Sequence, residues 1–265
     1  MKNITKDILI SILATILFGI VLCGIYPVFI WVAGQLLFPS QANGSLILDE
    51  KHQIIGSELL GQNFSSTKYF QPRPSAAGTG YDATSSSGSN LGPTSKKLIN
   101  GTTKSTALPA KVAGGPLQPG PDVEDFDGIK IRVLTYCDGN GIPYQLIQGG
   151  AVIDPKEFKT PQGDYDAVKL ITAFNDDAKP LTVKPGILIP GDAVTGSASG
   201  LDPHISPKNA ELQAGRVAKA RNLSLDAVKD EIKKATDYPT FGILGEPGVV
   251  NVLKLNVALD KLASK

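Results

Sequence analysis

Three polar residues at alternate positions, Asp202, His204 and Ser206, are the types that form a hydrolytic relay. A relay requires each group to point at the next one. In an extended segment, residues two positions apart point to the same side and lie next to one another. Ser206 is also followed by Pro207, which is a typical start of a helix. We therefore expect the segment Asp202, Pro203, His204 and Ser206 to form a structural or interface turn that leads into a helix, and we expect no catalytic residue.

A Ser/Gly-rich run at 85–92 is a second candidate site, because successive backbone N–H groups can bind phosphate. The residues that would contribute are Ser87, Gly88, Ser89, Asn90 and Gly92. The lysine of a phosphate-binding loop is missing, however, so a turn-rich loop is the simpler interpretation.

Two cysteines, Cys23 and Cys137, and two histidines, His52 and His204, show no metal-site spacing. Cys23 lies in an apolar block and Cys137 in polar sequence, so we expect neither a disulfide framework nor a bound metal.

The chain has 26 basic and 25 acidic residues. Such a balance is unusual for proteins that bind nucleic acids, so we expect no nucleic-acid partner.

The element that precedes these sites is an apolar segment at 8–38, with a core at about 10–33, and it contains no charge. About 20 apolar residues suffice to cross a bilayer as a helix, and the surplus allows a tilt or a break near Pro27. A cleaved signal peptide would have a shorter apolar core of roughly 7–15 residues. We predict a retained single-pass transmembrane anchor in contact with the lipid bilayer.

The charges around this anchor predict its orientation. Lys2, Lys6 and the amino terminus outweigh Asp7, and no basic residue follows the span until Lys51. The positive-inside rule therefore places residues 1–7 in the cytoplasm and the remainder of the chain outside it.

Small residues recur every four positions along the anchor. They are Ser11, Thr15, Gly19, Cys23 and Pro27. Residues with this spacing share one face of a helix, and small side chains allow another helix to approach closely. We predict that this face packs against a partner helix.

The remainder of the chain predicts an α+β soluble domain. Extended segments are expected within 44–60, followed by Ser/Gly/Pro-rich loops and a short helix after Ser95. Helices are expected after Ser206 and Ser224, and most of 249–263 is expected to be helical.

The middle of the chain has a different sequence pattern. The segment 129–137 alternates, Asp138–Gly141 is a turn signal, and 142–147 returns as a second apolar run. With 166–174 as a further strand, we predict a small β-rich unit.

Seven segments in order resemble the C subunit of the bacterial Kdp-type potassium-transporting P-type ATPase. They are FPSQANGSLI (38–47), IIGSELLGQNF (54–64), YFQPRPSA (69–76), SSGSNLGPTS (86–95), TGSASGLDPHISPKNA (195–210), RVAKARNL (216–223) and GEPGVVNVLKLNVALD (245–260). Members of this family pass from the fourth segment to the fifth through a much shorter stretch. The resemblance therefore implies a family domain at 39–100 and 190–265, with a β-rich insertion at 101–189.

The resemblance implies an accessory subunit that is not an enzyme on its own. Its partners would be a channel-like potassium-binding subunit and a P-type ATP-hydrolysing subunit in the bacterial plasma (inner) membrane, with the soluble domain outside the cytoplasm. The family is credited with stabilising the complex and with raising the ATP affinity of the P-type subunit. We expect no firmly bound cofactor, and we expect any role of ATP to be exerted through the complex.

Two other functions fit the residues. The chain could be a membrane-tethered binding module that uses the β-rich insertion, or an anchored hydrolase that uses Ser206.

In the transporter interpretation, an outward-facing domain is separated from cytoplasmic ATP. An indirect effect on ATP binding is therefore the favoured interpretation, and direct contact with ATP is the alternative.

Overall fold

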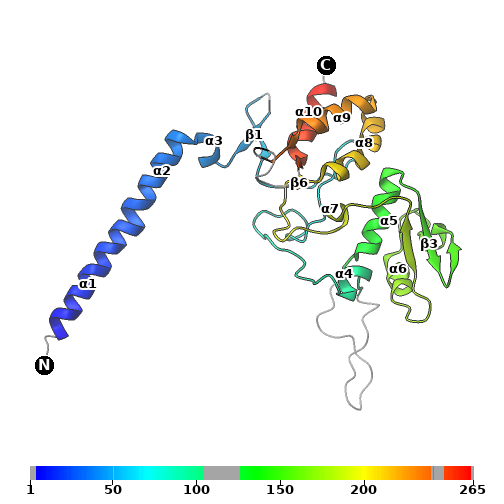
Figure 1. The fold of residues 1–265 in the computed structure, drawn as a ribbon, viewed down its shortest axis with the longest axis horizontal. Coiled ribbons are helices and arrows are strands. Elements are labelled where there is room, and N and C mark those ends of the chain that lie inside the picture. The colour runs from blue at the N-terminus through cyan, green and yellow to red at the C-terminus, as the bar shows by residue number, and fades with distance from the viewer. Residues whose placement is uncertain (1–3, 50, 104–125, 240, 242–247, 264–265) are drawn as a thin grey trace, which may run out of the picture. The chain divides into compact units, whose positions relative to one another are not determined.

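A computed structural model describes residues 4–49, 51–103, 126–239, 241 and 248–263. The chain divides into two compact units, Met1–Leu59 and Leu60–Lys265. Figure 1 shows the helices and strands of both units, coloured along the chain.

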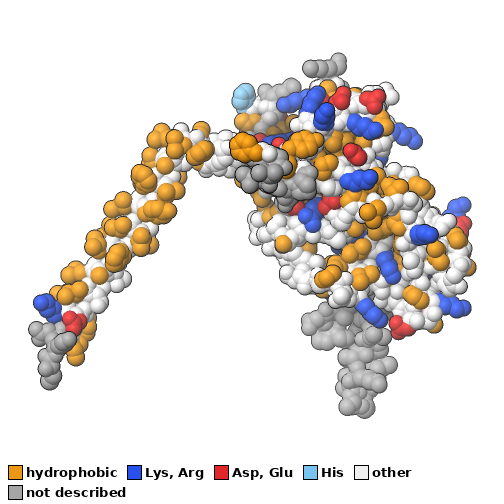
Figure 2. All heavy atoms as spheres, viewed as in Figure 1, with side chains coloured by type: hydrophobic (Ala, Val, Ile, Leu, Met, Phe, Trp, Pro, Cys, Tyr) orange, Lys and Arg blue, Asp and Glu red, His pale blue; other side chains and the backbone are white. Residues whose placement is uncertain are grey.

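A long apolar helix dominates the first unit. It runs as α1 (Ile4–Ile20), a π-helical turn (Val21–Ile25) and α2 (Tyr26–Leu37). These 34 residues have a mean hydropathy of 2.8 over their most apolar window, and none of that window is buried. Hydrophobic side chains cover its visible face along its length (Figure 2). At about 1.5 Å per residue it is long enough to cross a bilayer core of about 30 Å.

The sequence allows a tilt or a break near Pro27, and the structure has the π-helical turn there without interrupting the helix. Proline has no N–H to donate, and its ring crowds the preceding turn. The N–H of Tyr26 donates instead to the carbonyl of Val21, five residues back. The wider turn absorbs the disturbance, so the helix continues through Pro27.

A short helix and a hairpin follow the span. They are α3 (Pro39–Ala42), β1 (Leu46–Leu48) and β2 (Ile54–Ser57). The strands pair antiparallel, with Leu46 opposite Ser57 and Leu48 opposite Ile54. Asp49 Oδ1 accepts hydrogen bonds from the N–H groups of Lys51 and Gln53 at 2.8 Å, which closes the turn. The extended segments predicted here are confirmed.

The second unit alternates helices with short strands. Its helices are α4 (Lys96–Asn100), α5 (Ile129–Asn140), α6 (Ala167–Phe174), α7 (Gly191–Val194), α8 (Pro207–Arg221), α9 (Leu225–Lys234) and α10 (Val252–Ala263), with a 3₁₀ turn at Pro155–Phe158. Its strands are β3 (Tyr144–Gln148), β4 (Ala151–Ile153), β5 (Thr182–Pro185), β6 (His204–Ile205), β7 (Thr236–Asp237) and β8 (Val249–Asn251). They form two antiparallel sheets in the orders β4-β3-β5 and β6-β8-β7.

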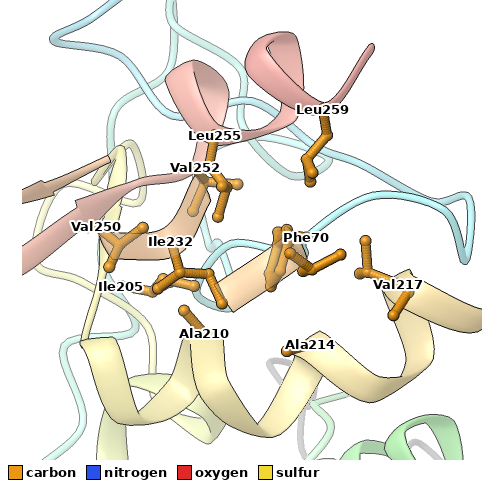
Figure 3. Close-up of a cluster of buried hydrophobic side chains, with 12 residues drawn as sticks. Phe70, Ile205, Ala210, Ala214, Val217, Ile232, Val250, Val252, Leu255 and Leu259 are labelled. Carbon is orange, nitrogen blue, oxygen red and sulfur yellow. The ribbon is translucent and has the colours of Figure 1, made fainter. Parts of the chain in front are cut away.

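One hydrophobic core lies around α8, and Phe70 reaches it from the long loop before α4 (Figure 3). Ala210, Ala214 and Val217 share one face of α8, and all three are fully buried. Helices α9 and α10 and the sheet β6-β8-β7 supply the rest of this core. The predicted caps are also present, since Ser206 and Ser224 each accept a hydrogen bond from an N–H group in the first helical turn.

A second core lies in the middle of the chain, between helices α5 and α6 and the sheet β4-β3-β5. Its buried residues are Ile131, Leu134, Leu146, Phe158, Leu170, Ile171, Phe174 and Leu181. Residues 104–125 of the predicted insertion lie outside the described residues.

Two predicted strands of this middle segment are wrong. The segment 129–137 belongs to α5, because the core uses Ile131, Leu134 and Cys137, three positions apart, and not alternate residues. The turn signal that follows is its C-terminal cap, with Gly141 in the left-handed region at φ 67°.

The segment 166–174 is also helical. Asp166 caps α6 by accepting the N–H of Lys169 at 3.0 Å. The mixed helix and strand content agrees with an α+β domain, but the β-rich character predicted for the middle is not confirmed. The boundaries of that predicted insertion stay a prediction.

Candidate functional site: an arginine-lined cavity

The predicted turn at 202–206 is held from two sides, and its polar groups do not form a relay. Asp202 pairs with Arg73 at 2.9 Å and accepts the backbone N–H of His204. Burial alone raises the pKa of the Asp202 carboxyl, but hydrogen bonds from His204 and Arg73 outweigh it and lower this pKa below its ordinary value. Asp202 therefore acts as an ionised anchor of the turn.

Ser206 faces Asp192 and not His204. Its N–H and its hydroxyl donate to the two carboxylate oxygens of Asp192, at 2.7 and 3.0 Å. The same hydroxyl accepts the N–H of Asn209 as the cap of α8. These contacts use Ser206 to fix the start of a helix, which is the structural role that the sequence favours.

The Ser/Gly-rich loop lies along the segment 196–200. The N–H of Ser87 donates to the carbonyl of Ser199 at 3.0 Å, and a Cβ at Gly88 would approach the carbonyl oxygen of Ala198 to 2.7 Å. Asn90 has a φ of 52°, typical of a tight turn. The loop packs against its own domain, and a nucleotide contact by Ser87, Gly88, Ser89, Asn90 or Gly92 stays a prediction.

The small residues of the span border a shallow apolar groove. Gly19, Cys23 and Gly24 line it together with five larger apolar side chains. Apart from the adjacent residues and the backbone of the helix itself, no atom of the described residues lies within 4 Å of a Cβ added at Gly19 or Gly24. Ser11 and Thr15 donate their hydroxyls to carbonyls four residues back in the helix. Ser11, Thr15 and Pro27 do not line the groove, and packing of the predicted face against a partner helix stays a prediction.

A cavity of about 520 Å³ opens between the loop 63–81 and helices α5, α7 and α8. Its walls include three arginines, Arg73, Arg132 and Arg216, and the aromatic rings of Phe64, Tyr81 and Tyr136. None of the described residues that line it is acidic. Cavities of this size commonly hold small molecules.

The first wall is a tightly bonded loop. Arg73 pairs with Asp202 and donates to the carbonyl of Gly196, while the Tyr81 hydroxyl donates to the carbonyl of Arg73 at 2.6 Å. Tyr81 itself lies in the left-handed region at φ 60°, which is uncommon for a bulky residue. Its N–H donates to Ser75 Oγ at 2.8 Å, which helps to hold the strained conformation.

The second wall is a buried polar network on α8. Gln213, 1% exposed, donates to the carbonyl of Gln71 and to Asn209 Oδ1. The Tyr136 hydroxyl donates to the same Asn209 oxygen at 2.7 Å. These bonds join α8 to α5 and to the loop.

Arg216 completes this wall by binding neutral acceptors. It donates to the carbonyls of Thr67 and Tyr69, to Asn140 Oδ1 and to Gln213 Oε1, at 2.6–3.0 Å. Burial lowers its pKa below the ordinary arginine value, although the approach of Tyr136 opposes this shift.

Arg132 projects from α5 and has fewer direct contacts. It donates to the carbonyl of Val194 at 3.4 Å and its guanidinium lies 5.1 Å from the ring centre of Phe126. Burial lowers its pKa, and the charge of Asp127 acts in the opposite direction.

Sequence reasoning missed this cavity. Its three arginines lie far apart in the chain, and none belongs to a local motif. The available signal was the rarity of arginine, since only four of the 26 basic residues are arginines. In the described part of the chain, no group of three or more His, Cys, Asp or Glu residues could hold a metal ion.

Comparison with known proteins identifies the family. The model of the family "KdpC: K+-transporting ATPase, c chain" matches residues 8–116 and 164–261. The "Potassium-transporting ATPase KdpC subunit" of Mycobacterium tuberculosis is 38% identical over 257 residues, which is 97% of this chain and 99% of the relative. The protein of the same name from Myxococcus xanthus is 37% identical, over 95% of this chain and 87% of the relative. The chain belongs to the KdpC family of potassium-transporting ATPase subunits.

Proposed function

We propose that this chain is a non-catalytic assembly and regulatory subunit of an ATP-driven potassium uptake complex. The observation that supports this most directly is family membership over nearly the whole chain, combined with one exposed apolar helix long enough to span a membrane. Its partners would be the channel-like, potassium-binding subunit and the P-type, ATP-hydrolysing subunit of the same complex.

The span would join this complex through its groove at Gly19, Cys23 and Gly24. In a bilayer, close packing of helices drives association because lipid supplies no hydrophobic force between them. The groove has no side chain at Gly19 or Gly24 and a small one at Cys23, which allows a close approach there, and its lining residues all belong to this helix.

The soluble unit would lie outside the cytoplasm of a bacterial plasma (inner) membrane. Lys2 and Lys6 flank the cytoplasmic end of the span in this orientation. Protease added to spheroplasts should then digest residues 60–265, whereas protection in sealed cells would contradict the orientation.

The subunit would raise the ATP affinity of the P-type subunit indirectly. A domain on the outer face cannot reach cytoplasmic ATP, but it can favour one conformation of the pump. Coupling of this kind is reciprocal, so ATP must strengthen the binding of the subunit by the same factor.

This mechanism is tested by two measurements on the purified complex. Removing the subunit should raise the apparent dissociation constant for ATP, and a non-hydrolysable ATP analogue should slow dissociation of the subunit. Saturable ATP binding to the isolated full-length subunit at cellular concentrations would contradict the indirect mechanism. Failure of the subunit to co-purify with two large multi-span proteins would contradict the proposed function itself.

A further inference from the structure

The cavity gathers a residue type that is rare in this chain. Of 26 basic residues, four are arginines and the remaining 22 are lysines (26 − 4). Three of the four arginines line the cavity, and none of its described lining residues is a lysine. The planar guanidinium donates two parallel hydrogen bonds to a carboxylate or phosphate, which an ammonium does not.

The positive charge in the cavity is only partly balanced. Arg73 has a direct carboxylate partner in Asp202, whereas Arg216 is bonded to neutral oxygens. Asp127 influences Arg132 without a hydrogen bond among the described contacts. Partly buried cations without a full countercharge favour an incoming anion, because partial burial weakens solvent screening.

The walls are held in place before any ligand arrives. The conformation of Tyr81 is kept by its bonds to Ser75 and Arg73, and Arg216 is fixed by four bonds. A preformed site loses less conformational entropy on binding than a flexible one.

We propose that this cavity binds a small molecule that carries a carboxylate or phosphate group. Arg132 donates to the oxyanion, and Arg73 and Arg216 shape the site and add positive potential. The rings of Phe64, Tyr81 and Tyr136 offer apolar contact to the rest of the molecule. Every wall comes from this chain, so binding requires no partner subunit.

The test uses the full-length protein in nanodiscs of zwitterionic lipid. Thermal unfolding is followed while orthophosphate, citrate or ATP is added, with chloride keeping the ionic strength constant. At about 100 times its Kd, a bound anion should raise the Tm by roughly 5–10 °C. The three probes separate inorganic phosphate, carboxylate and nucleotide as the source of the oxyanion.

Two variants locate the binding. Arg132→Gln should weaken it about tenfold to a hundredfold, the loss expected for a charge-assisted hydrogen bond. Thr135→Asp places a carboxylate at an exposed position in the cavity wall and should weaken binding about tenfold without removing a buried group. Lys229→Gln removes one exposed charge outside the cavity and should leave binding unchanged.

The outcomes are distinct. Saturable stabilisation by any of the three anions, lost in both cavity variants, supports the proposal. Absence of saturable stabilisation by all three, or an equal response of the cavity variants and the unaltered protein, overturns it. Stabilisation by ATP at cellular concentrations would in addition contradict the indirect mechanism proposed above, whereas membership of the pump complex is decided separately by co-purification.

Discussion

The carboxamide of Asn256 offers a sharp test of how the loop 63–81 is held. Asn256 lies on α10 and is 1% exposed. Its Oδ1 accepts the N–H of Phe70 at 2.8 Å, and its Nδ2 donates to the carbonyl of Phe70 at 3.0 Å. One side chain thus satisfies both backbone groups of a fully buried residue that belongs to no strand.

Asn256→Leu keeps the branching of the side chain at Cγ but removes both hydrogen bonds. Two buried backbone groups then lose their partners, at about 1–3 kcal/mol each, so the variant should lose about 2–6 kcal/mol of unfolding free energy. Asn256→Asp keeps the acceptor and loses the donor, and it places a carboxylate beside the carbonyl of Phe70.

The aspartate variant should depend on pH in a defined direction. Burial and the facing carbonyl disfavour the charged form, so the folded pKa lies above the unfolded value of about 3.9. The loss of unfolding free energy is therefore greatest above the folded pKa. It becomes smaller as the pH falls, because the protonated acid can donate to the carbonyl of Phe70. The leucine variant has no such group and should show no recovery.

Urea unfolding of the full-length protein in nanodiscs, followed by far-ultraviolet circular dichroism, measures both effects. Gln145→Leu likewise replaces a carboxamide side chain with leucine, at an exposed position of β3, and should change the unfolding free energy by less than about 0.5 kcal/mol. The reasoning fails if Asn256→Leu costs no more than this control, or if the aspartate variant keeps the same deficit at low pH.

Three further predictions concern the span, a helix cap and an ionised cluster. Gly19→Leu should fill the groove and weaken co-purification with the pump subunits about tenfold, whereas Val21→Leu, roughly opposite on the helix, should not. Ser206→Ala should lower the unfolding free energy by about 1–2 kcal/mol through loss of the cap, and reaction with a fluorophosphonate probe should be absent before and after the change. Hydrogen bonds from Lys159, Tyr165 and Tyr144 outweigh the effect of burial and lower the pKa of Asp138. The ionised carboxylate therefore stabilises the folded protein above about pH 3.9, and this contribution is lost as the pH falls through the folded pKa. Asp138→Asn should flatten this acid dependence in urea midpoints measured between about pH 6 and pH 3.

The sequence alone predicted the helix starts and the membrane span, because both depend on residues that are close together in the chain. Ser95, Ser206 and Ser224 each precede a helix and each accepts an N–H group of its first turn. The apolar run at 8–38 predicted a span, because its length and lack of charge admit few other structures.

The middle helices were mispredicted because their sequences fit two periods. In α5, Ile129, Ile131 and Val133 alternate as a strand would, yet Ile131 and Leu134 also have helical spacing. Only the packing against β3 and α6 decides between them, and that packing involves residues distant in the sequence. The turn signal at 138–141 was equally ambiguous, since a glycine in the left-handed region ends helices as well as joining strands.

The arginine-lined cavity bears on the alternative that the middle segment is an independent binding module. Helix α5 supplies Arg132 to one wall, and its Tyr136 and Asn140 bond directly to Asn209 and Arg216 of α8. A module attached by linkers would not share a buried hydrogen-bond network with the domain that carries it. The family model leaves residues 117–163 unmatched, and this part of the chain, which includes α5 and Arg132, is joined to the rest of the second unit by these contacts. Removing the middle segment would therefore open the cavity and expose the polar face of α8. Loss of function after such a deletion would reflect damage to the rest of the domain and not the absence of a separate binding activity.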